Sequence, residues 1–337
     1  MQKLKLKEVF QYVFFLGLGI GLIWYSGKDL TDEQLDQLKS SWKLARFEYI
    51  IPVVLALLAS HYSRALRWLQ LMKPLGYTPT RLNTYFAVLL GYFFNMLVPR
   101  LGEVMKCTVL AKYEKVAPDK LVGTILAERA VDMVSMTIVA ILMVIIQFDR
   151  IGSYAIDTFA GLVKGKSGDF SYVRLLFILL AIVLLIVGVR WLFRRYHDRG
   201  LIVKIKKVGA GIWDGIKTLR QIDNLPLFIF HTIFIWSMYL VGIWIGFMAF
   251  PPVAHLGFQA SVSVLIFGSL GMIATQGGIG AYQFAVEKTL LRFGIPNVMG
   301  LAFGWIIWAS QTAITLLSGL FALIVMPIVN ARKPHHA

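Results

Sequence analysis

The feature that most constrains this chain is a series of apolar segments, each about 20 residues long, the length with which a helix crosses a bilayer. Six of these segments are uninterrupted, at roughly 9–25, 49–72, 121–148, 172–193, 227–250 and 298–326. Of all residues, 58% are hydrophobic and only 15% are charged, whereas soluble domains carry about a quarter charged residues. We therefore expect an all-α integral membrane protein in which residues 1–337 form a single transmembrane domain.

Two further apolar stretches, 82–113 and 258–293, are interrupted near the middle. Pro99 and Gly102 break the first, and the glycines of TQGGIG (275–280) break the second. An arm over 82–97 would be about 24 Å long as a helix, too short to span comfortably. Each stretch is expected to form either a re-entrant helical hairpin or two short spans.

The net charge of +16 is concentrated in the loops 73–81, 112–120 and 194–226. Cytoplasmic loops of membrane proteins carry an excess of Lys and Arg. This rule predicts that these loops and both termini are cytoplasmic. It also explains the charge without a nucleic-acid partner, because anionic lipid headgroups lie beside such loops.

The order of the segments repeats with opposite orientation. Residues 9–148 run helix, helix, hairpin, helix from the inside, and residues 172–326 run in the same order from the outside. Two inverted halves, each with a Gly/Pro-interrupted segment, are typical of inverted-repeat transporters. The alternative is an ordinary six-helix membrane protein with two kinked helices.

The interruptions are the first candidate binding elements. The free N–H groups and the dipole of a helix that starts after a break favour an anion. The tips VPRLG (98–102) and TQGGIG (275–280) enter from opposite faces and are expected to meet near the midplane. A lipid phosphate there would find tip N–H groups and nearby arginines.

Arginines inside a span are candidates for function, and guanidinium binds phosphate with two parallel hydrogen bonds. Arg64 and Arg67 lie late in the span 49–72. For Arg67, extension to the cytoplasmic headgroups is an equally good interpretation.

Three ionisable residues, Glu128, Arg129 and Asp132, fall within five positions of the span 121–148. Arg129 is expected to pair with Asp132, three positions away, and the group to face the bundle interior. Glu103 and Glu287 follow the two tips. Each is expected either to carry a coupling proton or to balance a nearby cation, namely Arg100, Lys106, Lys288 or Arg292.

Other kinds of site lack support in the sequence. Cys107 is the sole cysteine, so no internal disulfide is possible. No metal-binding or nucleotide-binding spacing is present, and neither a cofactor nor a metal is expected. No nucleophile has an evident base beside it.

Four motifs occur in a family-specific order: Arg64-x-x-Arg67-Trp68, Asn95-x-x-x-Pro99-x-x-Gly102-Glu103, Glu128-Arg129-x-x-Asp132 and Gln276-Gly277-Gly278-x-Gly280. With them, residues 9–326 resemble the lysylphosphatidylglycerol synthase transmembrane-region family, the flippase-like membrane half of multiple peptide resistance factor. Some members are fused to a soluble domain that transfers lysine or alanine from tRNA to phosphatidylglycerol. The resemblance implies lipid movement between leaflets, and we expect no aminoacyl transfer because the chain stops at Ala337.

We therefore expect a lipid translocase of the bacterial inner membrane that moves a phospholipid or a polyprenyl-linked lipid with an anionic headgroup. An intramembrane lipid-modifying enzyme, with Glu103 and either Glu128 or Asp132 as acid and base, stays open. So do a non-catalytic partner of a separate lipid synthase, and a homo-oligomer. The expected substrate-binding residues are Arg64, Arg67, Asn95, Arg100, Gly102, Glu103, Lys106, Glu128, Arg129, Asp132, Gln276, Gly277, Gly278, Gly280 and Glu287.

Overall fold

The computed structural model describes residues 6–28, 30–98, 100–147 and 222–331. Within these residues the fold is all α, as expected, with ten α-helices and no strand. The expected span 172–193 lies outside the described residues. The helices are α1 (Leu6–Gly27), α2 (Asp32–Ser40), α3 (Ile50–Met72), α4 (Arg81–Leu97), α5 (Leu101–Glu114), α6 (Pro118–Ile146), α10 (Leu225–Met248), α11 (Phe258–Ala274), α12 (Ala281–Leu291) and α13 (Asn297–Ala331).

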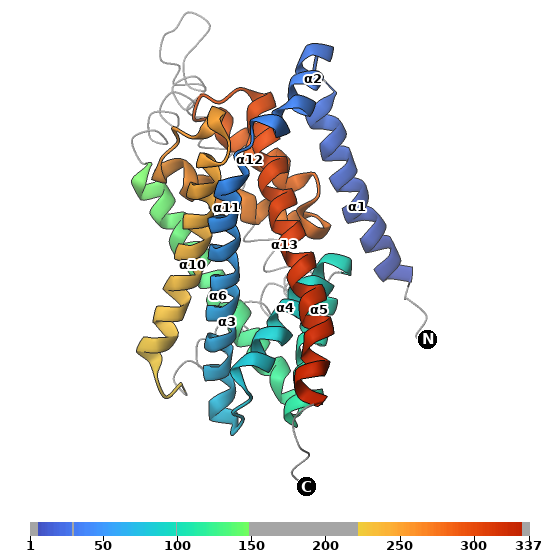
Figure 1. The fold of residues 1–337 in the computed structure, drawn as a ribbon, viewed down its shortest axis with the longest axis vertical. Helices are drawn as coiled ribbons and strands as arrows, with labels where there is room; N and C mark the ends of the chain where they lie inside the picture. The colour runs from blue at the N-terminus through green and yellow to red at the C-terminus, as the bar shows by residue number, and fades with distance from the viewer. Residues whose placement is uncertain (1–5, 29, 99, 148–221, 332–337) are drawn as a thin grey trace, which may run out of the picture.

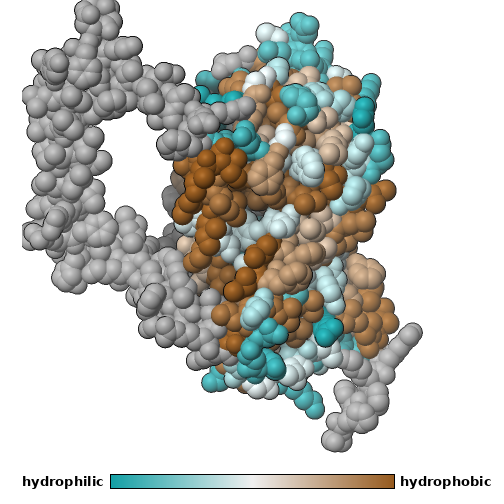
Figure 2. Space-filling view, turned by 90° about the vertical axis from the view of Figure 1, so that its left-hand side faces the viewer, coloured by the Kyte–Doolittle hydropathy of each residue, from teal (hydrophilic) through white to brown (hydrophobic). Residues whose placement is uncertain are grey.

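Four helices, α3, α6, α10 and α13, are long and apolar enough to cross a membrane. They coincide with the expected spans 49–72, 121–148, 227–250 and 298–326, and α1 covers the expected span 9–25. In Figure 2, hydrophilic residues gather at the two ends of the molecule and most hydrophobic residues lie between them. These features are those of a multi-pass membrane protein.

Both interrupted stretches contain a break in the helix. In the first, Val98 is extended and Arg100 adopts a left-handed conformation with φ of 66° before α5 begins. In the second, Thr275 is extended and three glycines, Gly277, Gly278 and Gly280, have φ of 61°, 74° and 75°. Glycine adopts positive φ without the steric cost that a side chain adds, so the second break needs these glycines.

The arms on either side of each break lie antiparallel. At the open end of α4 and α5, Glu114 accepts hydrogen bonds from Asn83, at 2.5 Å, and from Thr80. Near the break, a Cβ on Gly102 would lie 1.8 Å from the carbonyl oxygen of Gly91. The arms of α11 and α12 also approach closely at Gly271, where a Cβ would lie 2.7 Å from the carbonyl oxygen of Ala281. We call α4 with α5 the first helix pair, and α11 with α12 the second helix pair.

Figure 1 shows the second helix pair in the upper half of the molecule, the first helix pair in the lower half, and α13 running along both. The backbone of α13 meets α12 at Gly304, where a Cβ would lie 3.1 Å from the Cα of Gln283. Further along, Gly319 abuts Phe93 of α4. The carboxy-terminal end of α13 is tied to the start of α4 by hydrogen bonds between Asn330 and Asn83 at 2.8 and 2.9 Å.

Helix α6 also contacts both helix pairs. Its Glu128 meets α5 through Lys106, and its end meets α11 where Gln147 donates to Ser263 at 2.6 Å. Helices α3 and α10 pack against each other. The site described below lies where α3, α4, α5 and α6 converge.

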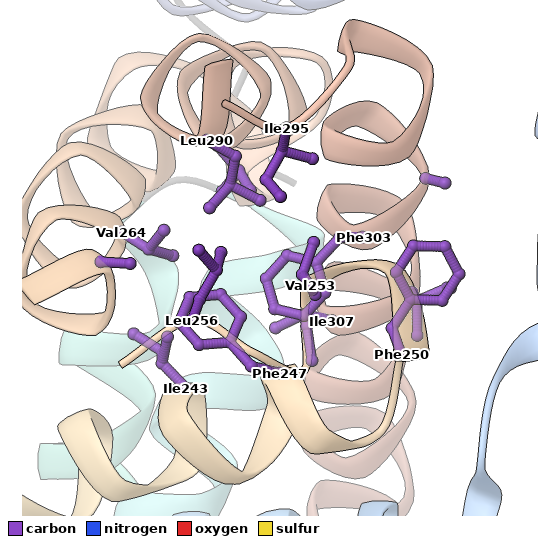
Figure 3. Packing of buried hydrophobic residues seen from close by; sticks show 14 of the residues in the cluster. Ile243, Phe247, Phe250, Val253, Leu256, Val264, Leu290, Ile295, Phe303 and Ile307 are labelled. Atoms are coloured by element: carbon purple, nitrogen blue, oxygen red, sulfur yellow. The ribbon is translucent and has the colours of Figure 1, made fainter. Parts of the chain in front are cut away.

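Two apolar clusters support these helices. The upper one joins α10, α11, α12 and α13, with Phe247, Leu290 and Phe303 pointing toward one another (Figure 3). The lower one joins α3, α4, α5 and α6 around Trp68 and Leu110, both fully buried. Large apolar side chains in such clusters pack at the density of organic crystals, which keeps the polar side chains between them in one arrangement.

Candidate functional site

Five charged side chains from α3, α5 and α6 form a network beneath the first break. Arg64 Nη1 lies 2.9 Å from Glu128 Oε1 and 2.5 Å from Asp132 Oδ2. Arg67 Nη2 lies 2.7 Å from Asp132 Oδ1, and Lys106 Nζ lies 2.7 Å from Glu128 Oε2. We call Arg64, Arg67, Lys106, Glu128 and Asp132 the buried ion cluster.

The buried ion cluster is not electrically neutral. Its three cations and two carboxylates leave a formal charge of 3 − 2 = +1. The Arg67 side chain is 0% exposed and that of Glu128 only 5%. Charges attract more strongly in such surroundings than in water, and unbalanced buried charge is costly. The cluster is therefore suited to an additional negative group.

Aromatic side chains surround the cluster. Lys106 Nζ lies 3.9 Å from the centre of the Trp68 ring, a cation–π contact. Arg64 reaches the Tyr239 hydroxyl at 3.4 Å, and His61 stacks on Tyr92 with ring centres 4.2 Å apart. These rings limit the access of lipid tails and water to the charges, so the electrostatic interactions inside stay strong.

A small polar cavity adjoins the cluster. Its volume is about 30 Å³, room for about one water-sized group. Its lining includes the half-exposed ion pair between Glu103 and Arg129, 3.1 Å apart, whose side chains are 38% and 52% exposed. The cavity thus connects the buried charges to an accessible pair. The lining residues are Arg64, Val88, Gly91, Tyr92, Asn95, Gly102, Glu103, Lys106, Ile125, Glu128 and Arg129.

The two breaks meet directly above this cavity. Gln276 Nε2 of the second break donates to the carbonyl oxygens of Asn95, at 2.9 Å, and Met96, at 3.0 Å. Asn95 Oδ1 in turn accepts from the N–H of Gly102 at 2.9 Å. Trp308 of α13 holds the second break through its bond to the Gly277 carbonyl at 2.7 Å. The two breaks are therefore hydrogen-bonded to each other, and α13 holds the second break in place through Trp308.

Most of the residues expected to bind substrate are brought together here. Ten of them belong to the cavity, the buried ion cluster or the contact between the breaks. They are Arg64, Arg67, Asn95, Gly102, Glu103, Lys106, Glu128, Arg129, Asp132 and Gln276.

Other expected residues lie apart. Arg100 is exposed and makes no ion pair with a described residue. Its side chain therefore does not reach the cluster in this conformation. Glu287 belongs to the second helix pair and contacts Lys288 at 2.6 Å. Gly277, Gly278 and Gly280 shape the second break, with no side chain to offer.

Three expectations for individual residues are wrong in this structure. Arg129 pairs with Glu103 and not with Asp132, because Arg64 and Arg67 occupy the Asp132 oxygens. For the same reason only part of the Glu128–Asp132 segment faces the interior, since Arg129 is half exposed. The extension of Arg67 to the headgroups is excluded by its full burial.

Residues of α10 were not expected at the site. Tyr239 and Thr232 bind the two arginines, and Ser63 Oγ lies 2.9 Å from His231 Nδ1. The Ser63–His231 contact also revises the expectation that no nucleophile has a base nearby. In the sequence, Tyr239 and the adjacent residues His231 and Thr232 stand in the apolar run of α10, which is typical of packing positions, so no local signal marked them.

A second, larger cavity lies between α1, α6, α11 and α12. Its volume is about 1060 Å³, and its lining is mostly apolar, with Leu22, Phe267 and Leu270 among its walls. It contains none of the expected substrate-binding residues.

Comparison with known proteins decides the family. The family model described as "Lysylphosphatidylglycerol synthase TM region" matches residues 12–319. The chain belongs to the lysylphosphatidylglycerol synthase TM region family. The resemblance in the four ordered motifs is thereby confirmed, and the matched residues include every helix from α3 to α12.

A similar protein from another organism supports the same family assignment. The chain is similar to UPF0104 membrane protein MJ1595 of Methanocaldococcus jannaschii, with 23% identity over 310 residues. The alignment covers 84% of this chain and 83% of that protein. No solved structure matches the chain significantly.

Proposed function

We propose that this member of the lysylphosphatidylglycerol synthase TM region family is a lipid translocase. It binds the anionic headgroup of a phospholipid or a polyprenyl-linked lipid in the small polar cavity and exposes it alternately to the two leaflets. The observation that carries the proposal is the net charge of +1 in the buried ion cluster. Guanidinium and ammonium groups are the side chains that bind phosphate best.

The roles follow from the contacts. Arg64 and Lys106 line the cavity and would bind phosphate oxygens directly. Glu128 and Asp132 hold these cations in place until the lipid arrives. Arg67, which is fully buried behind them, adds positive charge without touching the lipid. A cavity of about 30 Å³ is too small for a headgroup, so this conformation is the closed one.

Matching details in the two helix pairs support an inverted repeat. In the first helix pair, Gly102 follows Gly91 by 11 residues, and in the second, Tyr282 follows Gly271 by the same number. In each helix pair, a Cβ on one of these glycines would clash with the opposite arm. Asn95, four residues after Gly91, forms a hydrogen bond within the first break, and Thr275, four residues after Gly271, forms one within the second break. In this repeat, residues 9–148 and 172–326 are the two halves. Each helix pair enters and leaves the membrane on the same face, and the two helix pairs use opposite faces.

The expected movement separates the two breaks. Gln276 holds the second break to the carbonyls of Asn95 and Met96, directly over the cavity. Release of these bonds opens a path for the headgroup while its tails stay in lipid. Rocking of one inverted half against the other, with the binding site between them, is the usual form of alternating access.

We place the protein in the cytoplasmic (inner) membrane with both termini cytoplasmic. The first helix pair then opens to the cytoplasm, where Arg81, Lys112 and Lys120 lie near its ends. The start of α1 and the end of α13 both point toward this lower end in Figure 1. The excess of positive charge at one end supports this orientation.

An intramembrane enzyme is the second candidate, and the contact between Ser63 and His231 at 2.9 Å favours it. A hydroxyl beside an imidazole is the arrangement of an activated nucleophile. Both residues lie in the interface between α3 and α10, and neither lines the polar cavity. Translocation therefore accounts better for the cavity. Mass spectrometry of lipids after incubation with the protein separates the two, since a translocase leaves them chemically unchanged.

Reconstitution tests the proposal. Purified protein in liposomes should move fluorescent anionic phospholipids between leaflets faster than protein-free liposomes. Lys106→Met should abolish this movement, whereas Lys39→Met, at a side chain 74% exposed in α2, should not change it. If no anionic lipid crosses faster than in empty vesicles under any gradient, translocation by this chain alone is wrong. Copurification with a lipid synthase would then favour the role of a partner subunit.

A further inference from the structure

Two polar side chains of α12 are buried without satisfying their hydrogen-bonding groups. Gln283 is 1% exposed and Glu287 is 2% exposed. Neither amide atom of Gln283 has a hydrogen-bond partner among the described residues, and neither does Glu287 Oε2. Buried polar atoms in native proteins are nearly always bonded to protein, water or an ion. Three open atoms on one short helix therefore indicate a ligand.

The geometry places these two residues on one side of α12. Residues four apart lie on the same face of a helix, so Gln283 and Glu287 are neighbours. Opposite them α13 presents two glycines with the same spacing, Gly300 and Gly304, whose Cβ positions would lie 3.2 Å and 3.1 Å from the Cα atoms of Glu287 and Gln283. No α13 side chain at these two positions competes for the polar atoms.

The charge of the surroundings selects the kind of ligand. Glu287 Oε1 is bound by Lys288 Nζ at 2.6 Å, and Lys288 is the charged group within ion-pair distance among the described residues. Helices α10, α11 and α13 contribute apolar side chains to the cluster that packs against α12 (Figure 3), such as Phe247, Val264 and Phe303. A lipid phosphate would be repelled by the carboxylate. A small cation would be attracted, because carboxylate and amide oxygens are the ligands that hard cations prefer.

We propose that Gln283 and Glu287 form a binding site for Na⁺, held between Glu287 Oε2 and Gln283 Oε1. Its role as the coupling site of transport rests on the proposed function. Helix α12 starts at the second break, five residues after Gln276, the residue that joins the two breaks. Occupation of the site thus acts on one rigid helix whose start lies beside that contact.

The binding test does not require transport. Purified protein in nanodiscs should bind ²²Na⁺ at equilibrium in choline buffer. Glu287→Gln should abolish this binding. Glu48→Gln, at an exposed carboxylate between α2 and α3, should keep it. Thermal unfolding of each variant checks that it folds.

Two further variants separate a cation site from a plain ion pair. Lys288→Met should keep the cation signal, because Lys288 competes for the same carboxylate. Gln283→Leu should lose the Na⁺ signal, because the site then lacks its amide oxygen. The proposal is overturned if folded wild-type protein binds no ²²Na⁺, or if Glu287→Gln leaves the binding unchanged. A cation signal with no lipid movement would overturn the proposed transport and leave the site standing.

Discussion

The amide of Gln276 donates to the backbone carbonyl of Asn95 at 2.9 Å, although 181 residues separate the two in the chain. The same nitrogen reaches the carbonyl of Met96 at 3.0 Å. A helix end normally leaves its last carbonyls without partners, and in a membrane such groups must be satisfied by protein. One side chain of the second break thus completes the end of α4 in the first.

Cross-linking tests the importance of this contact. In a Cys107→Ala background, which lacks other cysteines, Met96→Cys and Gln276→Cys should react with a short, cleavable bis-thiosulfonate. Lipid movement should fall to the rate of empty vesicles and return after reduction, because the breaks are first locked and then released. The Gln276→Cys variant alone should not respond to the reagent. Undiminished movement in fully cross-linked protein would contradict the separation of the breaks.

The net charge of the buried ion cluster leads to a rescue experiment. Arg67→Met reduces the formal charge of the cluster from +1 to 0, and the amount of anionic lipid retained on purification should fall relative to zwitterionic lipid. Adding Asp132→Asn restores a charge of +1 from Arg64, Lys106 and Glu128. Lipid mass spectrometry should then show partial recovery. Equal retention of both lipid classes in all three proteins would show that the charge of the buried ion cluster does not determine headgroup binding.

Removal of a carboxylate should have very different effects at buried and exposed positions. Glu128→Gln leaves Lys106 without its buried carboxylate partner and leaves Arg64 with Asp132 alone, and it should cost about 3–5 kcal/mol of folding free energy. Glu103→Gln breaks a half-exposed pair with Arg129, worth about 0–1 kcal/mol. Thermal unfolding in detergent compares the two. Similar melting temperatures would mean that the cluster contributes little to the fold.

The close contact at the first break should not tolerate a side chain. A Cβ on Gly102 would lie 1.8 Å from the Gly91 oxygen and 2.6 Å from Asn95 Cγ. Gly102→Ala should therefore destabilise the protein by about 1–3 kcal/mol or more. Gly242→Ala is the matched control, because a Cβ there meets nothing within 4 Å. It should be neutral or stabilising, and a lower melting temperature only for Gly102→Ala is the expected readout.

The proposed orientation is tested with a membrane-impermeant maleimide in the Cys107→Ala background. Lys39→Cys in α2 should be labelled in intact cells, since this end is expected to face outward. Lys120→Cys, exposed in the first turn of α6, should be labelled only after the membrane is permeabilised. The reverse pattern would invert the topology and place the termini outside.

Much of the fold was predictable because hydropathy and helix breakers act locally. The lengths of α3, α6, α10 and α13 follow from their apolar runs, and a break before α5 was expected from Pro99, a residue type that interrupts helices. The pairing of charges was not predictable. Arg129 pairs with Glu103 of another helix and not with its neighbour Asp132, because the rotation of α6 against α5 is set by packing across the bundle. The same reason hid Tyr239 and His231, whose role depends on the contact between α3 and α10.

The length of α13 has a consequence for the lipid around the protein. Its 35 residues make a rod of about 52 Å, whereas the hydrocarbon layer is about 30 Å thick. The rod must lean, or its ends must stand among headgroups, and the angle changes with bilayer thickness. Since this rod touches both helix pairs, a thicker or thinner bilayer presses on the upper and lower halves of the molecule at once.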